Sequence, residues 1–399
     1  MKNIIQLFSF VAMVCFALSC SKELESHKPT DDDPTVPQQV TGVSVVNQNG
    51  KATITYVVPN DPHLLYVKAT YTLGTGVAAE TKASYFNNTL VVEGFADTLE
   101  HEVKLYSVSR SEIASAPVIV KIKPLVSPIW LVYRSLQFVN AFGGYNLTAV
   151  NSMKANITIE VLKKNVFNEY ERDNDKSIYT NVDSILSKIR GLDTLSYTFG
   201  FLVKDRWGNK TDTLYKVIKP LYEVEFSAAN FSTFTLPGDA PQVTNGAALQ
   251  YMWDGKLGWP YTSFTEQAAG GPNPHMVTFS TGVTGKISRI YIRPFPEGVR
   301  FYYLSTMKRF EIYGSTAPNL NGALDATWRL LGSYTVVKPS GLPYGTDDAV
   351  DQATGAAGFN WEVDLAAPKV KYIRIRCLEN FAGGTAQSIN EIKVYGDPR

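Results

Sequence analysis

The sequence predicts an all-β protein that consists of two immunoglobulin- or fibronectin-like sandwiches followed by a jelly-roll sandwich. Three observations predict this fold class. Aromatic residues make up 12% of the 399 residues, with 22 tyrosines among them, and this composition favours strands. Short segments of alternating apolar and polar residues recur between turns rich in Gly, Pro and Asn. No long segment has a convincing apolar period of 3.6 residues, so helices are not expected to form the cores.

The net charge and the cysteines narrow the possible functions. The chain has 38 basic and 37 acidic residues and a formal net charge of +1, so no overall field attracts nucleic acid, and nucleic acid is not expected as a partner. Two of the three cysteines lie in the first twenty residues, which leaves Cys377 without a partner for an intrachain disulfide in the folded part. The neighbours of Cys377 alternate as in a strand, which predicts a buried, unreactive thiol rather than a catalytic one.

Residues 1–19 are predicted to be a signal peptide. Lys2 precedes the apolar run Ile4–Leu18, which is too short for a transmembrane helix and has the length of a signal-peptide core. The run ends in Ala17-Leu18-Ser19-Cys20, which resembles a bacterial lipobox. This resemblance implies cleavage before Cys20, lipidation of Cys20 and durable anchoring in a membrane. An ordinary secretory signal is the alternative.

The polar segment at residues 20–38 is predicted to be a flexible tether. It contains Asp31-Asp32-Asp33 and three prolines, and it has too few apolar residues to fold. Acidic residues shortly after Cys20 also resemble the sorting signal of lipoproteins that reach the outer face of the outer membrane. The protein is therefore expected to be lipid-anchored in the outer membrane and to face the cell exterior.

Two small sandwiches are predicted next, over residues 39–124 and 125–222. The first has five strand-like segments at the spacing of an immunoglobulin or fibronectin sandwich. These segments are Ala52–Val58, Leu64–Leu73, Thr89–Val92, His101–Ser107 and Pro117–Ile122. The clearest strands of the second are Ala155–Leu162, Leu195–Val203 and Thr213–Ile218. Between Phe167 and Arg190 the strand pattern weakens into polar and charged residues.

Residues 223–239 are predicted to be a connector, and residues 240–397 a jelly roll with about eight strands. The strand-like segments are His275–Ser280, Ile287–Pro294, Lys308–Gly314, Trp328–Tyr334, Asn360–Leu365, Val370–Leu378 and Ser388–Tyr395. Ahead of them, Tyr251–Phe264 combines five aromatic residues with Gly, Pro and one Asp. This mixture excludes a helix and predicts a loop that presents rings to a flat, weakly polar ligand such as a sugar.

Six short motifs follow one another in the C-terminal part of the chain. They are Trp253-Asp254-Gly255, Arg289-Ile290-Tyr291-Ile292-Arg293-Pro294, Arg309-Phe310-Glu311-Ile312-Tyr313-Gly314-Ser315, Thr327-Trp328-Arg329-Leu330-Leu331, Tyr372-Ile373-Arg374-Ile375-Arg376 and Ser388-Ile389-Asn390-Glu391-Ile392-Lys393-Val394-Tyr395-Gly396. Their order and spacing resemble the discoidin or coagulation-factor type C fold, a galactose-binding-like jelly roll. The resemblance covers roughly residues 240–396.

In that fold a Ca2+ ion often braces the early loop against the final strand. The resemblance implies Asp254 and Glu391 as its carboxylate ligands, with backbone carbonyls near Lys256 and Pro260 completing an oxygen shell. The alternative is a plain Asp turn together with a buried Glu that accepts amide hydrogen bonds. The Ca2+ ion is expected to be structural, and no catalytic cofactor is expected.

Sugar binding in that fold comes from loops at one end of the sandwich. The resemblance implies seven candidate ligand-binding residues, namely Trp259, Tyr261, Arg300, Tyr302, Tyr303, Asn380 and Phe381. Aromatic rings stack on the C–H face of a pyranose, while Arg and Asn hydrogen-bond to its hydroxyls. The alternative is that these rings only close the end of the barrel, and that core role is favoured for Trp253 and Trp328.

The layout of a lipid anchor, two sandwiches and this jelly roll resembles lipoproteins of Gram-negative glycan-utilisation loci of the starch-utilisation type. The modules of those proteins are mostly catalogued as domains of unknown function. The sequence has no His-Glu-x-x-His, Gly-x-Ser-x-Gly or Walker motif, so an enzyme is not expected. The predicted function is a non-catalytic, cell-surface protein that captures a polysaccharide or oligosaccharide for an outer-membrane glycan-uptake complex. The alternative is a scaffold of that complex whose jelly roll binds a protein partner instead of a glycan.

Overall fold

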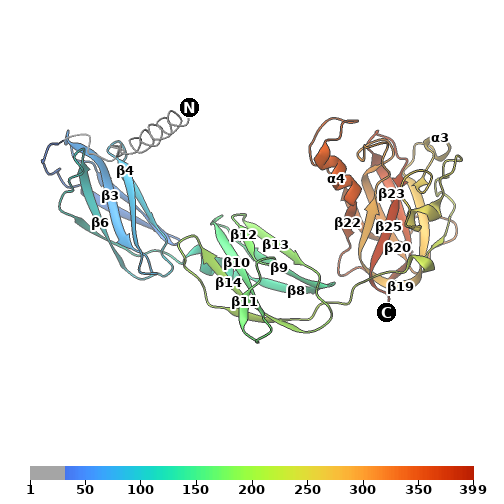
Figure 1. Cartoon of the computed structure of the whole chain (residues 1–399), viewed down its shortest axis with the longest axis horizontal. Coiled ribbons are helices and arrows are strands. Elements are labelled where there is room, and N and C mark those ends of the chain that lie inside the picture. Colours follow the sequence, from blue (N-terminus) through green and yellow to red (C-terminus); the bar gives the residue numbers. More distant parts are fainter. Residues whose placement is uncertain (1–31) are drawn as a thin grey trace, which may run out of the picture. The chain divides into compact units, whose positions relative to one another are not determined.

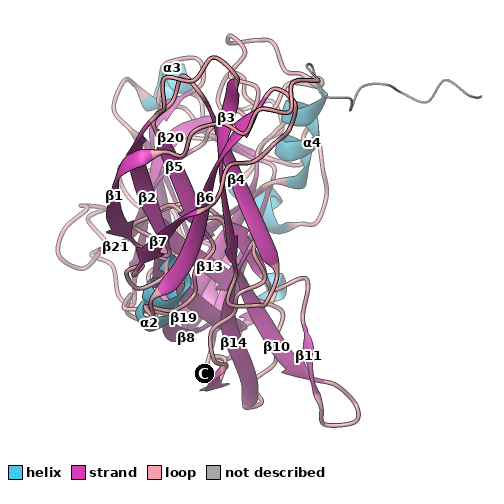
Figure 2. Cartoon of the chain, turned by 90° about the vertical axis from the view of Figure 1, so that its left-hand side faces the viewer, coloured by secondary structure: helices cyan, strands magenta, loops and turns pink. Residues whose placement is uncertain are grey.

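The computed structural model describes residues 32–399, which consist mainly of strands and loops (Figure 2). The predicted signal peptide, the predicted lipidation of Cys20 and the first part of the predicted tether lie outside these residues. Between residues 32 and 399, no helix is both long and apolar enough to cross a membrane. The described chain forms two compact units, one of residues 32–137, 148–186 and 199–216, the other of residues 138–147, 187–198 and 217–399. The fold class is all-β, as predicted.

The first sandwich lies within the first unit and contains two antiparallel sheets. One sheet has β1 (Thr41–Gln48), β2 (Lys51–Val57) and β5 (Thr89–Glu93), and the other has β3 (Leu64–Thr72), β4 (Ala78–Ser84), β6 (His101–Ser109) and β7 (Val118–Ile122). Because strand side chains alternate between the two faces, every second residue of β2 is buried, including Ile54 and Tyr56. These residues share one core with Val67 and Leu105 of the other sheet, which confirms the predicted sandwich.

Residues 125–222 contribute a five-stranded sheet and a three-stranded sheet. The first has β10 (Ile157–Lys164), β11 (Tyr170–Arg172), β12 (Ile178–Thr180), β14 (Tyr197–Asp205) and β15 (Leu214–Ile218), and the second has β8 (Gln137–Ala141), β9 (Gly144–Val150) and β13 (Ser184–Ile189). Two strands of the weakly patterned segment are only three residues long, too short to show alternation. The short helix α2 (Pro128–Ser135) was not predicted; it begins at a proline and buries Ile129 and Val132.

The central strand of the jelly roll, β19 (His275–Arg293), is 19 residues long. Its first part pairs with β23 (Val370–Asn380), and from Lys286 onward it pairs with β25 (Glu391–Asp397). Gly282 adopts a φ of +75° where the pairing register shifts, so β19 bends there and passes from one layer of the sandwich to the other. The sequence predicted two separate strands at this place, and the structure has one bent strand.

The remaining strands complete the two layers around one core. They are β16 (Val224–Glu225), β17 (Ser232–Thr233), β18 (Ser263–Phe264), β20 (Met307–Ser315), β21 (Arg329–Thr335), β22 (Phe359–Glu362) and β24 (Ser388–Ile389). Phe279, Ile312 and Val394 are fully buried in the core. Trp328 is buried as well, which confirms its predicted core role, while Trp253 packs partly buried against the same cluster. Cys377 is fully buried, as predicted, and burial raises the pKa of its thiol to about 12.

Two features of the jelly roll correct the predictions. Residues 223–239 are not a free connector, because β16 pairs with β25 and β17 pairs with β19, and both add short edge strands to the jelly roll. Helix α4 (Ala349–Ala357) was not predicted at all. It begins with a capping box in which Asp348 and Asp351 each accept a hydrogen bond from the backbone N–H of the other. The jelly roll also has the four-residue helix α3 (Gln267–Gly270) and the 3-10 helix η3 (Leu249–Trp253), which overlaps the start of the Tyr251–Phe264 stretch where no helix was predicted.

Candidate functional site

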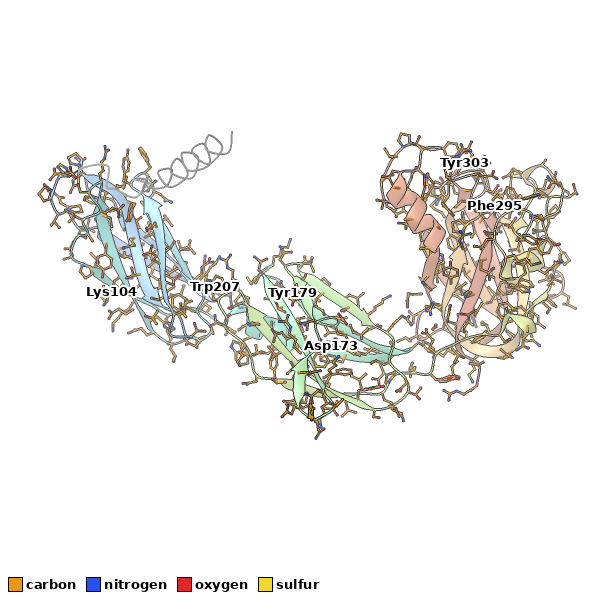
Figure 3. All side chains as sticks on the ribbon, viewed as in Figure 1. Lys104, Asp173, Tyr179, Trp207, Phe295 and Tyr303 are labelled. Carbon is orange, nitrogen blue, oxygen red and sulfur yellow. The ribbon has the colours of Figure 1, made fainter. Side chains whose placement is uncertain are left out.

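The loops of the jelly roll that carry the predicted site gather at one end of the sandwich. Figure 1 shows α3 and α4 at this end and the C-terminus at the opposite end. Figure 3 places Tyr303 and Phe295 at the same end as the two helices. We call this region the loop end. Rings within the sheets are buried between the layers, whereas rings on loops can face solvent. The loop end is therefore where the jelly roll can present rings to a ligand.

The first group of rings at the loop end is the Trp259 cluster, formed by Trp259, Phe264 and Phe295. The Trp259 ring centre lies 6.5 Å from that of Phe264 and 6.2 Å from that of Phe295, and both contacts are edge-to-face. Phe295 is buried, whereas Trp259 is 45% exposed. The indole therefore packs against two rings while much of its surface faces solvent, as expected for a ligand-binding residue.

The loop that carries Trp259 is fastened by a buried side chain, Asn390. Its Oδ1 accepts a hydrogen bond from the Gly258 amide at 3.2 Å, and its Nδ2 donates to the Tyr261 carbonyl at 2.6 Å. Arg293 donates to the same Oδ1 at 2.7 Å. Because Asn390 holds both sides of Trp259, the indole is presented on a fixed backbone. The role of Asn390 was not predicted, although the residue stands in the last of the six motifs.

The second group is the Tyr303 stack, formed by Arg300, Tyr303 and Tyr344. The Arg300 guanidinium lies 3.8 Å from the centre of the Tyr303 ring. The Tyr344 ring stacks on Tyr303 with centres 4.8 Å apart and planes 22° apart. Tyr344 is 49% exposed. It was not among the predicted residues, although it stands between Pro343 and Gly345, the same mixture of ring, Pro and Gly that marked the Trp259 loop.

Two of the predicted ligand-binding residues, Tyr302 and Asn380, are buried in the structure. Tyr302 is 1% exposed, and burial raises the pKa of its hydroxyl to about 12. Asn380 is 3% exposed; its Nδ2 donates to the Ala386 carbonyl at 2.9 Å, and its Oδ1 accepts from the amides of Ala382 and Gly384. Both side chains build the base of the loop end and have no surface to offer a ligand.

The other two predicted rings are partly covered. Phe381 packs against the core and meets Tyr302 edge-to-face at 5.5 Å. The ammonium of Lys256 lies 4.6 Å from the centre of the Tyr261 ring, which occupies one face of that ring. The exposed aromatic surface of the loop end thus comes mainly from Trp259 and Tyr344.

A carboxylate pair lies where the sequence predicted Ca2+ ligands. We call it the Glu391 corner, formed by Asp254, Gly255 and Glu391. Burial raises the pKa of Glu391 to about 7; the Asp254 carboxylate adds to the rise and the Gly255 amide opposes it. The Oε2 atom of Glu391 is buried without a hydrogen-bond partner. Such an unpartnered oxygen beside a second carboxylate fits a hard cation, which would also relieve the repulsion between the two groups.

The side-chain ligands of the Glu391 corner number only two. Within residues 32–399, no group of three or more His, Cys, Asp or Glu side chains could hold a metal ion. A Ca2+ ion held by Asp254 and Glu391 would therefore need backbone carbonyls or water for the rest of its shell. The Pro260 carbonyl, one of the predicted ligands, also accepts a hydrogen bond from the Thr262 amide at 2.7 Å.

The comparisons with known proteins define the chain as a series of three modules. Residues 37–124 match the family DUF4959, residues 125–229 match DUF5126 and residues 253–396 match DUF5000, each described as a domain of unknown function. Modules of unknown function are what the resemblance predicted. A comparison with curated proteins finds no match.

Among solved structures, the chain is similar to the SusE-like protein BT2857, with 24% identity over 67% of this chain and 98% of that one and a TM-score of 0.44. It is also similar to the C-terminal domain of a chitobiase from Bacteroides fragilis, with 15% identity over 43% of this chain and 97% of that one and a TM-score of 0.31. A third similar structure is the family 32 carbohydrate-binding module of NanJ from C. perfringens in complex with galactose, with 17% identity over 43% of this chain and 98% of that one and a TM-score of 0.30.

Proposed function

We propose that the chain is a non-catalytic carbohydrate-binding protein of the cell surface, and that the loop end of its jelly roll holds the sugar. One observation carries the proposal: Trp259 and Tyr344 expose about half of their surfaces on loops that the protein itself holds in place. A rigid exposed ring can stack on the C–H face of a pyranose at little cost in conformational entropy. Arg300, which lies over the Tyr303 ring of the same loop end, adds donors for sugar oxygens.

We also propose where the protein acts and which ion it holds. The chain is lipidated at Cys20, lies in the outer membrane facing the exterior and hands its glycan to an uptake complex. At the Glu391 corner, a structural Ca2+ ion is held by Asp254 and Glu391. The resemblance of the N-terminal residues to a lipobox supports the anchor, and the unpartnered oxygen of Glu391 supports the ion.

Isothermal titration of residues 21–399 tests the proposed function. The panel contains β-1,4-galactan, xyloglucan, pectin and mucin glycans, in buffer with Ca2+. We expect saturable heat with at least one of them and an affinity about tenfold lower in Trp259→Ala, because about 1.4 kcal/mol of ring contact is lost. Tyr179→Ala is the control, since Tyr179 is a 65% exposed ring on β12, outside the jelly roll.

Absence of heat across the panel, from a protein that unfolds cooperatively in Ca2+ buffer, would contradict the proposed function. The jelly roll would then be better explained as a scaffold module that binds a protein partner, and three exposed apolar residues of the same loops would form part of that surface, namely Val299, Leu304 and Leu342.

A further inference from the structure

The Tyr303 ring is covered on both faces. The Arg300 guanidinium is 3.8 Å from its centre and the Tyr344 ring centre is 4.8 Å away, so each is in van der Waals contact. Two planar groups cannot lie at these distances on the same face of one ring, so they lie on opposite faces. Tyr303, which the sequence predicted to be a ligand-binding ring, therefore supports its neighbours, and the free stacking surface of the group is the outer face of Tyr344.

The hydroxyl of Tyr344 lies close to Leu304 and Tyr303. Burial raises the pKa of Tyr344, the neighbouring Tyr303 phenol adds to the rise, and the Leu304 amide and Arg300 oppose it. The hydroxyl thus points toward the protein, beside Leu304 and Tyr303, while half of the side chain remains exposed. A ring that is stacked on one face against Tyr303 is a supported platform.

The loop that carries Tyr344 closes around one buried ammonium. We call residues 338–347 the Lys338 loop. Lys338, whose side chain is 8% exposed, donates to the carbonyls of Pro343, at 3.3 Å, and Thr346, and pairs with Asp347 at 2.9 Å. Tyr344 lies between these acceptors in the chain, so Lys338 fixes its backbone from both sides. A loop that is already ordered gives up little entropy when a ligand binds.

The Lys338 loop is also fastened to the segment that carries Tyr303. Asp347 Oδ2 accepts hydrogen bonds from the amides of Phe301, at 2.7 Å, and Tyr302, at 3.3 Å. Ser340, near the start of the loop, donates to Asp351 of α4 from both its amide and its hydroxyl. These contacts set the relative positions of Tyr344 and Tyr303 independently of any ligand.

Arg300 is free to bind an oxygen atom of a ligand. Its Nε reaches only the Glu297 carbonyl, at 3.4 Å, and no carboxylate within residues 32–399 forms an ion pair with it. By contrast, Arg309 and Arg376 of the same jelly roll pair with Glu379 and Glu311. Because Arg300 and the outer face of Tyr344 lie on opposite sides of Tyr303, one pyranose ring cannot touch both.

We propose that Tyr344 is the stacking platform of the sugar site, positioned by Lys338, and that the ligand is an oligosaccharide rather than a single sugar. One pyranose stacks on the outer face of Tyr344, and a neighbouring sugar residue accepts hydrogen bonds from Arg300 across the edge of Tyr303. This inference rests on the proposed function, because it assigns the platform and the ligand length of the same site.

Titration of residues 21–399 with matched probes tests the inference. The probes are β-1,4-galactotetraose, cellotetraose and xylotetraose, each beside its monosaccharide. We expect a tetrasaccharide to bind about tenfold more tightly than its monosaccharide, and Tyr344→Ala to lose about tenfold in affinity. Tyr344→Phe keeps the ring face and should stay within about twofold of the wild type. Arg300→Ala should weaken the tetrasaccharide and leave the monosaccharide unchanged, and Tyr179→Ala should change neither.

The results that overturn the inference differ from those that overturn the proposed function. If Tyr344→Ala keeps wild-type affinity for the sugar while Trp259→Ala loses affinity, the proposed function stands but Tyr344 is not the stacking platform. Equal affinity for tetrasaccharide and monosaccharide contradicts the inference that the ligand is an oligosaccharide. Absence of binding by the wild type to every probe and polysaccharide overturns both. Because Tyr344 is exposed, an unchanged melting temperature in Tyr344→Ala and Tyr344→Phe shows that a loss of binding is not a loss of fold.

Discussion

The Lys338 loop and the Glu391 corner use buried charge in opposite ways. The ammonium of Lys338 has two carbonyls and the carboxylates of Asp347 and Asp351 around it, so its charge is satisfied by the chain alone. The carboxylate of Glu391 faces a second carboxylate, Asp254, and keeps one oxygen without a partner. The first arrangement orders a loop with groups that the chain itself supplies. The second makes the local stability depend on a proton or a cation.

The largest expected effect on the free energy of unfolding comes from removing the Lys338 ammonium. Lys338→Met leaves the Asp347 and Asp351 carboxylates, both 0% exposed, without their cation. We expect the free energy of unfolding to fall by about 3–5 kcal/mol, the usual cost of breaking a buried ion pair on one side. Urea denaturation measures the change, and hydrogen exchange of the non-proline amides within residues 340–346 shows whether the loop has lost its order.

The matched control is Lys256→Met, because the Lys256 ammonium lies over an aromatic ring at an exposed position. It should change the free energy of unfolding by less than about 1 kcal/mol. If Lys338→Met also costs less than about 1 kcal/mol and the non-proline amides within residues 340–346 stay protected from exchange, the order of the loop does not depend on Lys338.

A smaller effect is expected at the Glu391 corner. The folded-state pKa of Glu391, about 7, lies above its ordinary value of 4.5, so between these pH values the folded state binds more protons than the unfolded state. In EDTA, stability should therefore fall as the pH rises from 4.5 through 7, with a melting temperature lower by about 2–4 °C per kcal/mol lost. Glu391→Gln, which cannot ionise, should remove this part of the pH dependence.

The effect of Ca2+ on the melting temperature should depend on the charge of Glu391. At pH 8 a Ca2+ ion should neutralise the ionised pair and raise the melting temperature, whereas at pH 5 protonated Glu391 should bind it poorly. Asp254→Asn should abolish the Ca2+ effect at pH 8. A melting temperature that does not respond to Ca2+ at pH 8 would leave Asp254 as a plain turn residue and Glu391 as a buried acid.

The smallest effect is expected from a neutral group without a partner. The Tyr302 hydroxyl is buried and makes no hydrogen bond, although its ring supports the loop end and lies 6.0 Å from the Lys338 ammonium. Tyr302→Phe removes only this hydroxyl, so unfolding should change by less than about 1 kcal/mol and sugar affinity should not change. A tenfold loss of affinity would show that Tyr302 reaches the ligand after all, contrary to its burial.

The sheets could be predicted from the sequence because their pattern is local. Alternation in β2 and in the two halves of β19 reports which residues face a core, and the ends of these strands coincide with Gly or Pro. The edge strands β16 and β17 could not be predicted, because two residues cannot show a period and their pairing partners lie far away in the chain. Helix α4 is short, and its start depends on an Asp pair that also suits a turn.

The candidate site was only partly predictable. Tyr302 and Tyr303 are consecutive and chemically identical, and the sequence does not indicate that the first is buried and the second partly exposed. That difference arises because Asp347, 45 residues after Tyr302, binds its amide and fixes the direction of the chain. Tyr344 becomes part of the site through the same long-range contacts. A ring between Pro and Gly was the only local signal for it.

The most direct test of the central claim is a crystal structure of residues 21–399 with the tetrasaccharide that gives the strongest heat. We expect one pyranose on the outer face of Tyr344, a neighbouring sugar within hydrogen-bonding distance of Arg300, and unchanged positions for the Lys338 loop. A sugar bound to a sheet face of the jelly roll or within the first compact unit, with Tyr344 and Trp259 uncovered, would contradict it.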